Sequence, residues 1–197
     1  MVGEGLHLRG AQGAADAKRW LDRTTRVDVR WVNPNPMAVP KLTFSLPNGN
    51  TFSFDIGGLM RGGDVDGAMF LAEVKNYTND NGQGPMYEEF LAKCYRAFLE
   101  RSQMCDNFMF ITWAPFKATT WSSLTSSDEI KKAVKKHWKY NFDSAEQAAA
   151  ASLDQLLLED IASRLWLLVL SAKQIEHLSM STEHLAIINE HETRMGG

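Results

Sequence analysis

Asp55, Glu73 and Lys75 are the residues whose types and spacing could carry out chemistry. Asp55 lies in the stretch TFSFDIG, the other two lie in FLAEVKNY, and in both stretches apolar and polar residues alternate. Side chains of a β-strand point alternately to its two faces, so each stretch predicts a strand with one apolar face and one charged face. The two strands, joined as a hairpin, would bring both carboxylates and the lysine to the same face.

The connection between the two stretches determines which residues oppose each other. It reads RGGDVDG, residues 61–67, and is rich in the Gly and Asp that tight turns favour. Closure of the hairpin near Asp64 predicts three opposed pairs: Phe54 with Val74, Asp55 with Glu73, and Ile56 with Ala72. Opposed side chains lie about 4.5–5.5 Å apart at Cβ, where two carboxylates repel by about 3 kcal/mol at an effective dielectric near 20. A divalent cation would turn this repulsion into a ligand set, so the pair predicts a metal site.

Two other acidic residues compete for the same role. Asp64 and Asp66 are nearer to Glu73 in sequence, but at the tip of the turn they would lie more than about 10 Å from it along the strand. We expect both to form the turn. A further interpretation stays open, in which Asp55, Glu73 and Lys75 form an ordinary exposed charge cluster.

The composition limits the class of protein. With 197 residues, 44% of them hydrophobic, the chain can bury one core with an appendage or form two small domains. A net charge of −3 is not the global signature of a nucleic-acid binder, so such binding would depend on local basic patches.

The cysteines and the apolar runs indicate where the protein works. Cys94 and Cys105 fit no metal-binding spacing and predict reduced thiols. The N-terminus lacks a signal-peptide core, and the longest apolar run, 165–170, is too short to span a bilayer. We therefore expect a cytoplasmic protein without a membrane-spanning segment.

The elements around the hairpin follow from periodicity and turn residues. Residues 1–10 predict a flexible lead, and a short helix follows at 11–21. Alternation predicts strands at 26–32 and 41–46, which together with the hairpin form a meander of about four strands over 25–77. A helix at 86–102 and an apolar strand at 107–116 come next. The helix is long enough to cross over the sheet, so we expect the strand after it to run parallel to the strand of Glu73.

The last third of the chain predicts helices. Ser126 and Ser144 each begin a capping box, and a long helical stretch through residue 178 follows the second box. Its run LLLEDIASRLWLLVL is apolar nearly all round, which indicates burial against the core or a second subunit. The helix after Ser126 carries the one concentrated basic patch: Lys131, Lys132, Lys135, Lys136 and Lys139. These lysines could contact nucleic-acid phosphates or form a solvated helix face, and both interpretations stay open.

The order helix, strand meander, Asp on the third strand, Glu-x-Lys on the fourth, helix and buried strand resembles the core of the PD-(D/E)XK nuclease superfamily. The matching residues are Asp55, seventeen intervening residues, and then Glu73-Val74-Lys75. The resemblance covers roughly residues 10–120 and is specific only at the hairpin. It implies an α/β, restriction-endonuclease-like core with a mixed central sheet flanked by helices over 1–125, followed by a helical C-terminal region over 126–197.

The resemblance also implies roles for residues. Asp55 and Glu73 would bind Mg²⁺, for which Mn²⁺ would substitute, with the Val74 carbonyl as a third ligand, and Lys75 would orient the attacking water. Relatives often carry a Glu on the first helix, where this chain offers only Gln12 and Asp16. Some relatives carry a further polar residue after Glu-x-Lys, for which the candidates are Gln83, Tyr87 and Glu88.

These implications predict a Mg²⁺-dependent deoxyribonuclease that works within a dimeric or multi-component assembly, in defence or in repair. Its partners would be DNA and a second copy or another protein, bound through the C-terminal helices. The alternative is a nuclease-fold scaffold or nucleic-acid-binding subunit that no longer cuts, which the acidic net charge and the missing first-helix Glu favour.

Overall fold

A five-stranded mixed sheet lies at the centre of the part of the chain that the computed structural model describes, residues 2–77 and 82–194. The strands in spatial order are β1 (Val27–Val32), β4 (Ile56–Met60), β5 (Met69–Lys75), β6 (Asn107–Thr112) and β7 (Leu165–Val169). The pairs β1–β4 and β4–β5 are antiparallel, whereas β5–β6 and β6–β7 are parallel. The protein therefore has a mixed α/β fold, as the sequence predicts.

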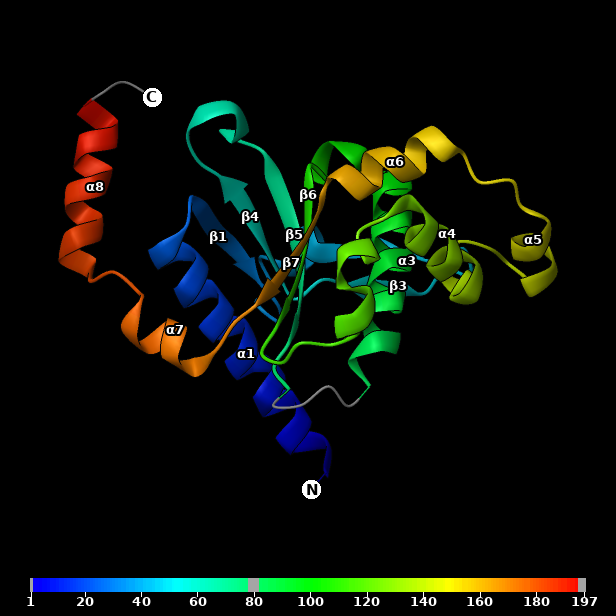
Figure 1. The fold of residues 1–197 in the computed structure, drawn as a ribbon, viewed down its shortest axis with the longest axis horizontal. Helices are drawn as coiled ribbons and strands as arrows, with labels where there is room; N and C mark the ends of the chain where they lie inside the picture. The colour runs from blue at the N-terminus through cyan, green and yellow to red at the C-terminus, as the bar shows by residue number, and fades with distance from the viewer. Residues whose placement is uncertain (1, 78–81, 195–197) are drawn as a thin grey trace.

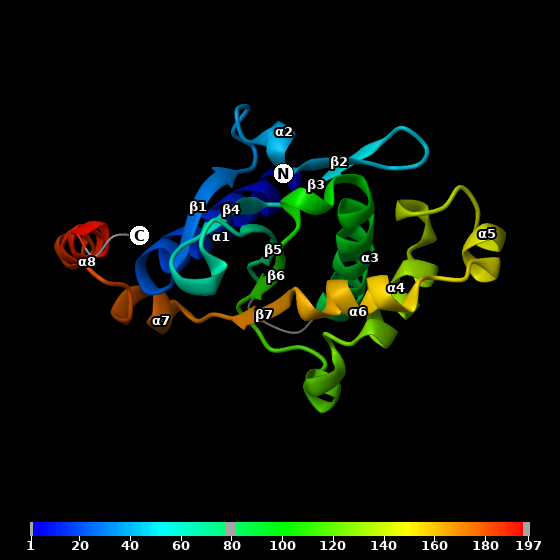
Figure 2. The ribbon, with the colours of Figure 1, turned by 90° about the horizontal axis from the view of Figure 1, so that it is seen from above.

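Helices cover both faces of this sheet (Figures 1 and 2). One face carries α1 (Val2–Thr24), and the other carries α3 (Gln83–Arg101), α4 (Ser127–Lys136) and α6 (Gln155–Ser163). The smaller elements are α2 (Val39–Leu42), β2 (Thr43–Ser45), β3 (Thr51–Ser53), α5 (Ala145–Ala150), α7 (Ala172–His177) and α8 (Thr182–Arg194). None of the described helices is both long and apolar enough to cross a membrane.

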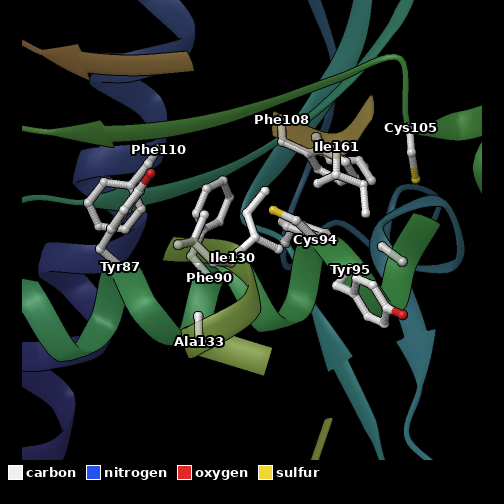
Figure 3. Close-up of a cluster of buried hydrophobic side chains, with 14 of the residues drawn as sticks. Tyr87, Phe90, Cys94, Tyr95, Cys105, Phe108, Phe110, Ile130, Ala133 and Ile161 are labelled. Atoms are coloured by element: carbon white, nitrogen blue, oxygen red, sulfur yellow. The ribbon is translucent and has the colours of Figure 1, made fainter. Parts of the chain in front are cut away.

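The larger core lies between the sheet and α3 (Figure 3). Tyr87 and Phe90 of α3 pack on Phe110 of β6, with ring centroids 5.1 Å and 5.4 Å apart. Each aromatic side chain of this kind contributes about 1.5–3 kcal/mol through burial. Cys94 and Cys105 are buried and unpaired, in agreement with the predicted thiols. The packing fixes α3 against β6 and so determines which α3 side chains lie over β5.

A second core lies under α1. Ala14, Ala17 and Leu21 pack on residues of β1, β4 and β5. The close approach requires Gly13, because a Cβ there would lie 2.7 Å from the Cβ of Asn76, directly after β5. Helix α1 begins at Val2, so the predicted flexible lead is wrong. Once the alanine-rich part is helical, each added residue gains one hydrogen bond without the cost of a new nucleus, which favours this extension.

The predicted register of the hairpin is confirmed at one of its three pairs. Ile56 pairs with Ala72 in the antiparallel register of β4 and β5. Strands β5 and β6, which come before and after the crossover helix α3 in the chain, run parallel to each other, as expected. Both predicted caps also form: Ser126 accepts a hydrogen bond from the Glu129 N–H, and Ser144 accepts one from the Gln147 N–H.

The predicted four-strand meander is wrong, because the stretch TFSFDIG changes partners at its centre. Strand β3 pairs only with β2, in a separate two-stranded sheet within the described residues, whereas β4 joins the main sheet. The Phe54 N–H donates to the Leu42 carbonyl, and the next N–H, of Asp55, donates to the Ala72 carbonyl. The ring centroid of Phe54 lies 5.7 Å from that of Phe44 and 6.3 Å from that of Phe90. A buried aromatic cluster thus holds the chain at this change of partner.

The predicted long C-terminal helix is also wrong. The apolar run divides into α6, which ends at Ser163, and β7, which pairs with β6. A short, continuously apolar segment fits a buried strand as well as a buried helix, so its periodicity could not distinguish them. Strand β7 extends the parallel part of the sheet, and residues 126–197 thus contribute to the same sheet as the hairpin.

Candidate functional site

The change of strand partner places Asp55 at a tightly held position. The Asp55 N–H donates to the Ala72 carbonyl at 3.0 Å, and the Asp55 carbonyl accepts from the Asn33 N–H at 2.9 Å. The side chain is half-buried, and its Oδ2 accepts a hydrogen bond from the Val74 N–H at 2.7 Å. Asp55 is therefore fixed against β5 by both its backbone and its carboxylate.

Glu73 lies on β5, on the face that α3 covers, and is 5% exposed. Its Oε1 accepts from two ammonium groups, those of Lys75 at 2.7 Å and Lys93 at 3.3 Å. Its Oε2 is buried and has no hydrogen-bond partner among the described residues. Buried polar atoms are nearly always paired, so an unpaired carboxylate oxygen requires an explanation.

Lys93 is a member of the site that the sequence interpretation missed. It projects from α3, is 9% exposed, and also forms an ion pair with Glu89 at 3.3 Å. Glu89 in turn accepts a hydrogen bond from the Tyr140 hydroxyl. The sequence did contain a signal, because Lys93 falls beside Phe90 and Cys94 on the apolar face of the helix, and a buried lysine needs an anionic partner.

Burial and the neighbouring carboxylate change the acidity of Asp55. Burial is the larger cause, the charge of Glu73 adds to it, and together they raise the pKa of Asp55 to about 6. The two lysines offset part of this effect. Burial opposes the charged form of Lys75 and of Lys93, but the carboxylates outweigh burial and raise the pKa of both ammonium groups. The carboxylates thus keep both ammonium groups charged at neutral pH.

Gln83 and Tyr87, two of the three polar candidates on the crossover helix, are buried next to this site. Thr112, which pairs with Lys75 across β5 and β6, donates its hydroxyl to Gln83 Oε1. Gln83 Nε2 donates to the Ala114 carbonyl, and the Tyr87 hydroxyl donates to the Leu124 carbonyl at 2.8 Å. Both side chains tie the segment after β6 to the start of α3.

Glu88, the third candidate, binds two lysines from outside α3. Lys117 and Lys136 donate to its two carboxylate oxygens at 2.7 Å and 2.5 Å. Burial opposes its charged form, but the hydrogen bonds from these lysines outweigh burial and lower the pKa of Glu88. Nothing in the local sequence around Lys117 indicated this contact, because it lies in a loop and meets α3 only through the fold.

The other predicted nucleic-acid-binding lysines lie on or next to α4, and most have contacts within the protein. Lys132 pairs with Glu129 at 2.7 Å, Lys135 donates to the Ala149 carbonyl, and Lys139 lies 5.8 Å from the Trp138 ring. Lys131 is exposed. Lys136 is the member of the patch that reaches α3, and the role of the whole patch in binding stays a prediction.

The remaining acidic candidates lie away from the pair. Asp66 Oδ1 accepts from the Gly62 N–H at 2.7 Å in the turn between β4 and β5, where Asp64 also lies, as predicted. On α1, Gln12 is exposed and Asp16 pairs with Arg19 at 3.2 Å. Asp16 lines a groove of about 900 Å³ between α1 and α7, and this groove includes none of Asp55, Glu73 and Lys75. No residue is therefore assigned to the role of the Glu that nuclease relatives often carry on the first helix.

The described residues contain no group of three or more His, Cys, Asp or Glu side chains placed to hold a metal ion. Asp55 and Glu73 are two carboxylates, so the predicted donor set depends on the Val74 carbonyl and on water for its other ligands. One oxygen of each carboxylate is held by protein donors, which are the Val74 N–H for Asp55 and the two lysines for Glu73. The unpaired Oε2 of Glu73 makes this set fit a small hard cation.

Comparison with known proteins gives little guidance. No protein-family model and no curated protein matches the sequence. Among solved structures, the chain is similar to the Cap4 SAVED/CARF-domain containing receptor of Moraxella osloensis, with a TM-score of 0.39 and 12% identity. The match covers 85% of this chain and 33% of the receptor, so the chain spans about a third of that protein's length. A similarity at this level carries no argument about fold family or function.

Proposed function

We propose that the protein is a metal-dependent nuclease that hydrolyses DNA phosphodiester bonds, with Asp55, Glu73 and Lys75 as its catalytic residues. One observation carries the proposal: a buried Glu73 beside Asp55 keeps one carboxylate oxygen without a partner among the described residues, while Lys75 and Lys93 share the other. Bringing charged groups out of water costs several kcal/mol each unless they are fully paired. The arrangement is therefore poor for stability and suited to binding a cation.

The donor set supports Mg²⁺ as the cofactor, with Mn²⁺ as its substitute. Asp55, Glu73 and the Val74 carbonyl would hold the ion, because Mg²⁺ prefers oxygen ligands and keeps several of its waters. When bound, the ion would polarise the phosphodiester and lower the pKa of an attacking water.

The lysines account for the rest of the chemistry. Lys75 lies at the end of β5 and its side chain is 22% exposed, so its ammonium can orient the attacking water or meet a phosphate oxygen. The exposed lysines of the patch at 131–139 would contact the DNA backbone at a distance from the reacting bond.

The arrangement of elements supports a restriction-endonuclease-like core as the fold family. Asp55 lies directly before β4 and Glu73 lies on β5 of an antiparallel hairpin, and α3 crosses from β5 to the parallel strand β6. The C-terminal part would supply the surface for a second copy or another protein, because α8 exposes Ile187 and Ile188 and lies away from the sheet (Figure 1).

Digestion of a plasmid in Mg²⁺ and in EDTA tests the proposal. Asp55→Asn and Lys75→Met each remove one charged group at nearly constant volume, and we expect each to slow cutting by on the order of 10²–10³-fold. Asp64→Asn, in the turn at the far end of the same hairpin, is the matched control and should cut at the wild-type rate. Undiminished cutting by both site variants would refute the assignment.

A scaffold or nucleic-acid-binding subunit that no longer cuts is the second candidate. The observation that favours it is that Lys75 and Lys93 already balance the charge of Glu73 in the absence of a metal. Calorimetry with Mn²⁺ separates the two functions. Absence of any binding would favour the scaffold, whereas a Mn²⁺ site that disappears in Glu73→Ala would count against it.

A further inference from the structure

Two ammonium groups bind a single carboxylate oxygen in this site. Lys75 of β5 and Lys93 of α3 both donate to Glu73 Oε1, at 2.7 Å and 3.3 Å. One cation is sufficient to balance one carboxylate, and burying a second lysine has a desolvation cost of its own. Lys93 also pairs with Glu89 at 3.3 Å, so the two lysines that share Glu73 have different sets of anionic partners.

The two lysines differ in how firmly the protein holds them. Lys93 is 9% exposed, forms an ion pair with Glu89 at 3.3 Å, and lies 6.0 Å from the ring of Tyr140. Within residues 2–77 and 82–194, the Lys75 ammonium bonds to Glu73 alone. Counting side-chain atoms only, Lys75 is 22% exposed and Lys93 is 11% exposed. Lys93 is thus anchored on three sides, whereas Lys75 is free to turn toward solvent.

We propose that Lys93 is a positioning residue that keeps Glu73 paired and oriented, so that Lys75 can leave Glu73 and bind a phosphate group of the substrate. Without Lys93, Lys75 would be the one cationic partner of a buried carboxylate, and its departure would leave that carboxylate unpaired. Because Lys93 bonds to Oε1, it also leaves Oε2 of Glu73 available to a cation. The assignment of Lys75 to the phosphate rests on the proposed nuclease function, but the sharing of Glu73 by two lysines does not.

A double-mutant cycle on the metal-free protein tests the shared contact. Urea unfolding in EDTA is measured for wild type, Lys75→Met, Lys93→Met and the double variant. We expect Lys75→Met to raise the unfolding equilibrium constant at least tenfold more when Lys93 is also Met, because Glu73 then has no cation. Adding Glu73→Gln to the double variant should restore stability. Additive effects of the two lysine substitutions would overturn the proposal, whether or not the protein cuts DNA.

Steady-state cleavage tests the positioning role. We expect Lys93→Met to lower kcat at least tenfold with a KM within threefold of wild type, and Lys93→Arg to restore most of kcat because it keeps the charge. Lys41→Met, an exposed lysine on α2, serves as the control. A wild-type kcat in Lys93→Met, or no rescue by Lys93→Arg, would overturn the role. If the wild type does not cut at all, the nuclease function fails and the cycle alone decides on the shared contact.

Discussion

Replacing Asp55 by Asn should stabilise the metal-free protein. The burial of Asp55 and, to a smaller extent, the charge of Glu73 raise its pKa from an ordinary 3.8 to about 6. The folded state therefore holds the Asp55 proton more tightly than the unfolded state, so this group lowers stability progressively as the pH rises from about 4 to 6. At about 1.4 kcal/mol for each pKa unit, the loss above pH 7 approaches 3 kcal/mol.

Asn keeps an acceptor for the Val74 N–H and removes the charge. We expect Asp55→Asn to raise the free energy of unfolding by about 1–3 kcal/mol at pH 7.5 and by much less near pH 4.5. The slope of that free energy against urea concentration should not change. Urea unfolding in EDTA at the two pH values measures this, with Asp64→Asn as the control in the turn. A variant that is no more stable than wild type at pH 7.5 would show that burial and the charge of Glu73 do not disfavour the ionised Asp55 in the fold.

Three further predictions follow from the same contacts. Addition of Mn²⁺ should raise the midpoint of thermal unfolding of the wild type and have no effect on Glu73→Ala, and an equal rise in both proteins would locate the ion elsewhere. Phe110→Ala should cost about 3–5 kcal/mol in urea unfolding, because Phe110 contacts Tyr87, Phe90 and Phe116 in the core, and a loss below 1 kcal/mol would contradict that packing. Ser126→Ala should cost about 1 kcal/mol by removing the cap of α4, whereas Ser126→Asp should cost less.

The pairing of Ile56 with Ala72, next to Asp55 and Glu73 in the chain, could be predicted because it depends on local rules. Strand alternation, a Gly- and Asp-rich turn and the count of residues between the acids together fix Ile56 opposite Ala72. The parallel crossover to β6 was predictable for a similar reason, since a helix of the length of α3 spans the sheet.

The features that could not be predicted depend on contacts between distant segments. The chain changes partner at Phe54 because that side chain packs with Phe44 and Phe90, which no alternation pattern records. Strand β7 forms because β6 has an open edge for it, although its own sequence fits a helix equally well. Lys93 joins the site through the packing of α3 over β5, where only its apolar surroundings in sequence gave a signal.

The central claim is that Asp55 and Glu73 share one divalent cation beside Lys75. Anomalous diffraction from crystals soaked in Mn²⁺ tests it most directly. The account predicts one strong peak between the two carboxylates, about 2.0–2.3 Å from an oxygen of each, and no peak in crystals of Glu73→Ala. Strong anomalous peaks elsewhere in the crystal with none between Asp55 and Glu73 would contradict it.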